Sequence, residues 1–136
     1  IQAVALRAKL LYLAEWCEKR REHAQLYSEL LRDTPAVTPT ELPDNNPVYH
    51  LYVINTPKRD ELQAWLKDKG IFTGIHYPIP IHQQKAMEFL GYQNGDFPVT
   101  EQVTKQILSL PIFAELGANE IEFVVDSIKA FYAKNF

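Results

Sequence analysis

The segment from Thr73 to His82 holds the residues of this chain that are best suited to binding chemistry. It reads TGIHYPIPIH, and on a strand His76 and Tyr77 would point to opposite faces. Pro78 and Pro80 remove two backbone donors and hold the following chain extended, which predicts a rigid rim rather than a mobile loop. A histidine and a tyrosine there could supply hydrogen bonds to a phosphate or a sugar hydroxyl. From the residues alone, the favoured alternative is a buried strand end with a satisfied histidine.

Other kinds of catalytic or metal site have less support. His76 and His82 are separated by two prolines, and the single cysteine, Cys17, lies far from both, so the ligands of a zinc site are not supplied. Cys17 falls on the apolar stripe of the first predicted helix, where most cysteines are packing residues. Arg20 and Arg21 could bind an anion, but a solvated or interface patch is the favoured interpretation. The residues alone give no complete catalytic set.

The elements that position this rim begin with a long helix. Apolar residues recur at spacings of three and four from Ala3 to Leu31, which places them on one side of a helix, and Thr34-Pro35 ends the pattern. A helix of roughly thirty residues would be about 45 Å long. A domain of this size could not surround it fully, so we expect part of the helix to run along another domain.

Two strands and several shorter helices are predicted next. Val48 to Ile54 indicates a buried strand, and Ile71 to Tyr77 indicates a second one that ends at the prolines. Thr56-Pro57 predicts the N-cap of a short helix that stops at Gly70. Three more helices are predicted: one over 83–90, one over 96–111, and one after the cap residue Gly117. In the helix over 96–111, Val103 and Ile107 would point inward. This order indicates an α+β fold, a few strands covered by helices.

Composition and charge exclude several classes of protein. The 136 residues suffice for one domain, and 46% apolar and 23% charged residues are typical of globular proteins. The net charge of −3 argues against a nucleic-acid partner. One cysteine favours a reducing cytoplasm, and no apolar stretch is long enough to span a membrane. Because the chain opens within a helical pattern and without an initiator methionine, we expect it to be a fragment.

Five blocks of the sequence, in order, resemble the DegT/DnrJ/StrS family of sugar aminotransferases. The blocks are Ile1-Gln2-Ala3 through Lys9-Leu10 with Trp16, Arg20-Arg21, Ala24 and Tyr27; His50 to Ile54 with Arg59-Asp60; Gly70 to His82; Phe97-Pro98 with Glu101; and Leu108 to Pro111. Together they cover nearly the whole chain.

The resemblance implies fold type I, in which a large domain holds pyridoxal phosphate and a small C-terminal domain closes the active site. Residues 1–32 would be the interdomain helix and residues 33–136 the small domain, a mostly antiparallel sheet covered by helices, with the large domain absent. Such enzymes transfer an amino group, usually from glutamate, to a keto-sugar carried on a nucleotide, and are typically dimers. They serve polysaccharide or antibiotic sugar biosynthesis, and the rim segment favours a 3-keto substrate.

By the same resemblance, His76 and Tyr77 lie where family members bring a small-domain loop toward the sugar nucleotide, and they would bind substrate without doing chemistry. The lysine that forms the Schiff base lies upstream in the family, so no catalytic, cofactor-binding or metal-binding residue is assigned here. The chain alone should bind no pyridoxal phosphate and be inactive. Two alternatives stay open, a family member without that lysine, such as a sugar dehydratase, and a non-catalytic regulatory or binding module.

Overall fold

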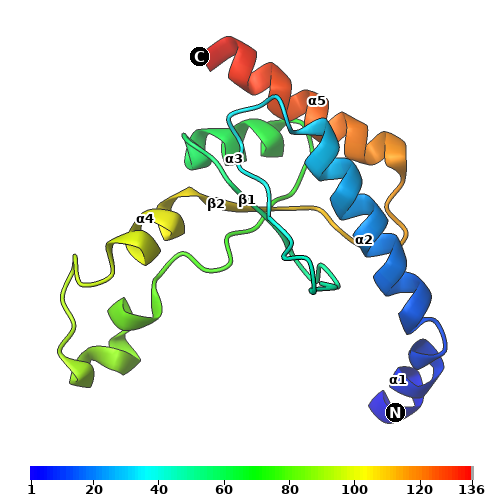
Figure 1. Ribbon diagram of the computed structural model, residues 1–136, viewed down its shortest axis with the longest axis horizontal. Coiled ribbons are helices and arrows are strands. Elements are labelled where there is room, and N and C mark those ends of the chain that lie inside the picture. Colours follow the sequence, from blue (N-terminus) through cyan, green and yellow to red (C-terminus); the bar gives the residue numbers. More distant parts are fainter. Residues whose placement is uncertain (136) are drawn as a thin grey trace.

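The computed structural model describes residues 1–135; Phe136, the last residue of the predicted small domain, lies outside them. The elements in chain order are α1 (Gln2–Leu10), α2 (Leu13–Leu30), β1 (Tyr52–Asn55), α3 (Arg59–Asp68), the 3₁₀ helices η1 (Ile81–Gln83) and η2 (Lys85–Leu90), α4 (Pro98–Gln106), β2 (Ile107–Leu110) and α5 (Ala118–Asn135) (Figure 1). Helices cover a small antiparallel sheet, which confirms the predicted α+β fold.

The core lies where α2, α3 and α5 meet the two strands. β1 pairs antiparallel with β2, with Tyr52 opposite Leu110 and Asn55 opposite Ile107. The predicted apolar face of α5 is confirmed, since all its members are buried: Ile121, Val124, Val125, Ile128, Phe131 and Tyr132. α5 begins after Gly117, whose N–H donates to the Glu120 carboxylate at 2.8 Å, as expected of a cap.

Two tyrosines connect α2 to the sheet. The rings of Tyr27 and Tyr52 stack with their centroids 5.1 Å apart. The Tyr27 hydroxyl donates to the Pro111 carbonyl at 3.0 Å, and the Tyr52 hydroxyl shares a hydrogen bond of 2.8 Å with Ser28. Burial raises the pKa of Tyr52 to about 12, so this hydroxyl keeps its proton and acts as a hydrogen-bonding bridge.

The predicted long N-terminal helix is divided at Leu11 and Tyr12 into α1 and α2. The apolar stripe is buried on the C-terminal part of this segment, at Ala24, Tyr27 and Leu31, whereas α1 has no buried residue. A nine-residue helix without buried side chains is only marginally stable in water, and no residue of α1 belongs to the core cluster. α1 therefore projects from the body (Figure 1).

The predicted strand from Ile71 to Tyr77 is wrong. This segment forms a single antiparallel bridge, between Gly74 and Ser109 of β2. In the same register Phe72 would face Pro111, which has no N–H to donate, so the ladder cannot continue in that direction. In the other direction the chain reaches the prolines and turns away from the sheet.

The helix predicted over 96–111 is also wrong in its second half. α4 ends at Gln106, and Ile107 begins strand β2. Pairing with β1 outweighs the local helical pattern, as often happens for short apolar runs. The buried side chains of α4 are Glu101 and Thr104, whereas Val103 is 38% exposed.

The ends of the two other short helical segments follow the expected glycine signals. Gly70 after α3 and Gly91 after η2 have positive φ angles, of 78° and 75°. The N-cap of α3 is Lys58 and not the predicted Thr56, whose buried hydroxyl contacts Tyr132 of α5 instead. No helix in the described residues is both long and apolar enough to cross a membrane.

Candidate functional site

His76 and Tyr77 lie where the chain leaves the edge of the sheet, and residues 74–80 are called the rim below. Both side chains are exposed, Tyr77 by 71%. Their rings meet edge to face, with centroids 5.5 Å apart. The expectation of a buried strand end, favoured from the residues alone, is therefore wrong. An exposed imidazole and an exposed phenol stand side by side and can both offer hydrogen bonds to a ligand.

One ring nitrogen of His76 is held by the sheet. Its Nδ1 lies 2.9 Å from the hydroxyl of Ser109, a buried residue of β2. Among residues 1–135 the other ring nitrogen, Nε2, has no hydrogen-bonding partner. His76 is thus anchored on one side and available on the other.

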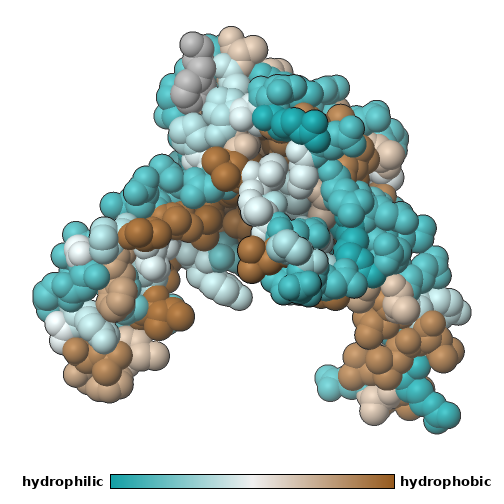
Figure 2. All heavy atoms as spheres, viewed as in Figure 1, coloured by the Kyte–Doolittle hydropathy of each residue, from teal (hydrophilic) through white to brown (hydrophobic). Residues whose placement is uncertain are grey.

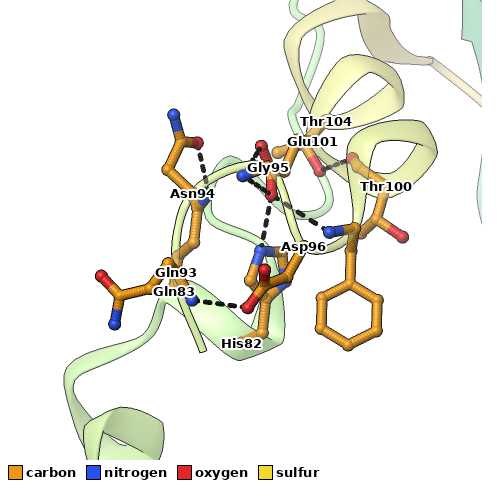
Figure 3. Close-up of polar contacts among 10 residues, drawn as sticks. His82, Gln83, Gln93, Asn94, Gly95, Asp96, Thr100, Glu101 and Thr104 are labelled. Atoms are coloured by element: carbon orange, nitrogen blue, oxygen red, sulfur yellow. Dashed lines mark hydrogen bonds and ion pairs between the residues drawn. The ribbon is translucent and has the colours of Figure 1, made fainter. Parts of the chain in front are cut away.

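After the rim the chain forms a lobe, residues 81–106, which is organised around the carboxylate of Glu101 (Figure 3). This carboxylate accepts hydrogen bonds from the backbone N–H of Gly95, at 2.9 and 3.0 Å, and more weakly from that of Phe97, at 3.4 Å. The His82 ring approaches it from η1, with Nε2 at 3.0 Å. The side chains of His82 and Glu101 are only 8% and 10% exposed. The carboxylate therefore joins η1, the loop before α4 and α4 itself.

The surroundings of Glu101 favour its ionised form. The Gly95 N–H, together with His82 and the Phe97 N–H, holds the pKa of this carboxyl below its usual range, although burial acts in the opposite direction. Sequence reasoning did not assign this role to Glu101. A glutamate in the first turn of a helix that begins at Pro98 was the available signal, because such a side chain can reach back to the preceding N–H groups.

Aromatic contacts complete the lobe. The Phe97 ring lies 4.7 Å from that of His82 and 5.0 Å from that of Tyr92, measured between centroids. These rings border an apolar hollow of about 330 Å³, which also involves Met87 and Leu90. The lobe has its own small cluster of packed side chains beside the rim.

The other residues considered for chemistry lie in contacts that support the fold. The Arg20 guanidinium donates to three backbone carbonyls, including that of Ile112 at 3.0 Å, so it is neither a solvated patch nor a free anion site. Arg21 pairs with Glu18 on α2. Cys17 is half-buried on the same helix. Within residues 1–135, no group of three or more His, Cys, Asp or Glu side chains could hold a metal ion.

Known proteins resemble this chain in both sequence and fold. A family model described as the DegT/DnrJ/EryC1/StrS aminotransferase family matches residues 1–129. The chain is 44% identical over 135 residues to the pleiotropic regulatory protein of Geobacillus stearothermophilus, which covers 97% of this chain. It is 37% identical over 131 residues, or 96% of this chain, to the dTDP-3-amino-3,6-dideoxy-alpha-D-galactopyranose transaminase of Aneurinibacillus thermoaerophilus.

The same likeness extends to a solved structure. The crystal structure of S. venezuelae DesV superimposes with a TM-score of 0.91 and 34% identity over 96% of this chain. The chain spans 36% of the length of each of these three proteins. Because the family model covers residues 1–129 of 136, the chain belongs to the DegT/DnrJ/EryC1/StrS aminotransferase family.

Proposed function

We propose that the full-length protein is a pyridoxal-phosphate-dependent aminotransferase that transfers an amino group from glutamate to a nucleotide-linked 3-keto-sugar. The family match over residues 1–129 carries this proposal. The name of the Aneurinibacillus relative, a transaminase for a 3-amino sugar on dTDP, supports amination at the third carbon. The cofactor supplies the electron sink for amino transfer, and residues upstream of this chain would hold it. We assign no cofactor contact to residues 1–135.

The proposed part of this chain in that activity is substrate binding by His76 and Tyr77. An exposed imidazole with a free Nε2 suits a phosphate oxygen, and an exposed phenol suits a phosphate or sugar oxygen. Neither residue takes part in the chemical step. They would add binding energy to the ground state and the transition state alike, which affects KM rather than kcat.

Replacement of His76 tests this assignment in the full-length enzyme. We expect H76A to raise the KM for the nucleotide-sugar about tenfold, because one hydrogen bond to a charged group is lost. The value of kcat should change little. H23A is the matched control, because His23 lies on α2, bonds to the Phe113 carbonyl, and should leave both constants unaltered when it is replaced. An H76A enzyme with the wild-type KM would remove His76 from the site.

Two further measurements separate the proposed activity from its alternatives. Formation of 2-oxoglutarate from glutamate, dependent on the keto-sugar, is expected of an aminotransferase and not of a dehydratase without the Schiff-base lysine. Borohydride reduction followed by mass spectrometry should find the cofactor fixed to a lysine upstream of this chain. An unmodified protein would favour the lysine-lacking alternative.

A regulatory role is the second candidate, because the Geobacillus relative bears the name of a regulatory protein. The net charge of −3 gives little basis for contact with nucleic acid. Fluorescence anisotropy with a DNA duplex at low salt should therefore show no binding. Tight binding that weakens steeply with salt would overturn the enzymatic proposal in favour of the regulatory one.

From the family match we also propose two partners for this chain, the large domain and a second subunit. The large domain would pack on α1 and part of α2, residues 1–32 acting as the interdomain helix, and the intact enzyme would be a cytoplasmic homodimer. Analytical ultracentrifugation of the full-length protein tests the dimer, which a monomeric mass would exclude.

A further inference from the structure

Three residues meet at the bridge between the rim and the sheet. Gly74 and Ser109 exchange two backbone hydrogen bonds, of 3.1 and 2.8 Å. The His76 ring folds back over Gly74, so closely that a Cβ atom added there would lie 2.5 Å from the ring carbon Cε1. The Ser109 hydroxyl lies 2.9 Å from His76 Nδ1. The imidazole thus occupies the space left by the missing glycine side chain.

We propose that Ser109 and Gly74 are positioning residues for His76. Ser109 fixes the ring by its Nδ1, Gly74 makes room for it, and together they leave Nε2 directed at the ligand. This inference rests on the proposed substrate-binding role of His76 and adds to it the residues that orient the ring. Glycine at position 74 is required for this space and not for its backbone, because its φ lies outside the left-handed region.

The burial of Ser109 also selects the tautomer of His76. Ser109 is 4% exposed, and among residues 1–135 its hydroxyl has only His76 as a partner. A buried O–H group without an acceptor is costly, so the hydroxyl donates to Nδ1 of the neutral ring. The ring proton then resides on Nε2. When the ring is protonated, Nδ1–H donates to the serine oxygen instead, and Nε2 still carries a proton. In both states the exposed nitrogen is a donor, which suits an anionic phosphate oxygen.

A double-mutant cycle in the full-length holoenzyme tests the inference. We expect S109A and G74A each to raise the KM for the nucleotide-sugar about three- to tenfold with kcat little changed, the first by releasing the ring and the second by displacing it. In the H76A background neither change should raise KM further, because both act through His76. S109T retains the hydroxyl and should restore a KM close to that of the wild type.

The possible outcomes separate this inference from the assignment of His76. If H76A leaves KM unchanged, the binding role fails and the positioning role with it. If H76A raises KM but S109A and G74A do not, His76 binds substrate without these two supports. The same conclusion follows if S109A or G74A raises KM further in the H76A background. Thermal midpoints of the variants accompany the kinetics. Should S109A alone lose its fold, the G74A cycle decides.

Discussion

Arg20 joins three segments that are far apart in the sequence. From α2 its guanidinium donates to the carbonyl of Ile112 at 3.0 Å, and to those of Tyr49 and His50 at 3.1 and 3.4 Å. The first carbonyl follows β2, and the other two precede β1. Tyr49 has a positive φ of 47°, a conformation that a non-glycine residue adopts only when its surroundings impose it. One side chain therefore holds the segment before β1 and the segment after β2, which lie at the same end of the sheet, against α2.

Removal of this side chain should destabilise the chain far more than removal of its neighbour. We expect R20A to lower the free energy of unfolding by about 2–3 kcal/mol, because three carbonyls lose a charged donor. The matched control is R21A, which removes a surface ion pair with Glu18 and should cost less than about 1 kcal/mol. Urea denaturation measures both values. Equal losses in the two variants would contradict the role of Arg20.

His76 and Tyr77 could be singled out from the sequence, whereas the residues that support them could not. Ser109 is 33 positions from His76, and Glu101 is 19 positions from His82. Such contacts depend on how the strand and the lobe fold back, and no local spacing encodes them. The exposure of the rim was missed for the same reason, since the alternation of side chains indicates a strand but not which of its residues lie beyond the sheet.

A helix or strand could be predicted from the sequence where its own residues carry the full apolar pattern. α5 shows a full 3.6-residue period and a capping signal at Gly117, and the observed helix has both. β2 was missed because its four residues follow α4 directly, and three of them are apolar without a clear period. Its strand conformation depends on pairing with β1, more than fifty residues earlier in the chain.

The lobe depends on one ionised group, and this makes its stability sensitive to pH. The pKa of Glu101 is lowered in the folded chain, so the carboxylate stabilises the lobe above its ordinary, unfolded pKa of about 4.5. This contribution is lost as the pH falls through the lower, folded pKa. His82 and Asp96 are the other titratable side chains of this network, Asp96 accepting from the Gln93 N–H at 2.8 Å.

Hydrogen exchange can follow the lobe directly. Between pH 7 and pH 3 we expect the protection factors of the Gly95 and Phe97 amides to fall about tenfold in the wild-type chain, as the carboxylate that accepts from them is protonated. In E101Q they should be low at both pH values. E88Q, which changes an exposed glutamate of η2, should behave as the wild type. Protection that is independent of pH in the wild type would show that Glu101 does not hold the lobe.

At the scale of the whole molecule, exposed apolar residues gather at two projecting ends, the α1 end and the lobe (Figure 2). At the α1 end Leu10 is 64% and Leu11 82% exposed, and in the lobe Phe89 is 81% exposed. Surfaces of this kind usually mark contacts with another domain or protein. The chain spans 36% of the length of its relatives, so the remaining part is the partner that we propose for α1.

Exchange of the α1 amides tests that contact. In the chain alone, α1 is a nine-residue helix without buried side chains, and we expect fast exchange from Val4 to Leu13. In the full-length protein the same amides should be protected at least about tenfold more, because packing of the exposed apolar side chains adds the stability that the isolated helix lacks. The amides of α5 are the internal control, since its apolar face is already buried and its protection should be similar in both proteins. Equal exchange of α1 in the two proteins would mean that the upstream part does not cover it, and its exposed apolar side chains would then need a partner outside the chain.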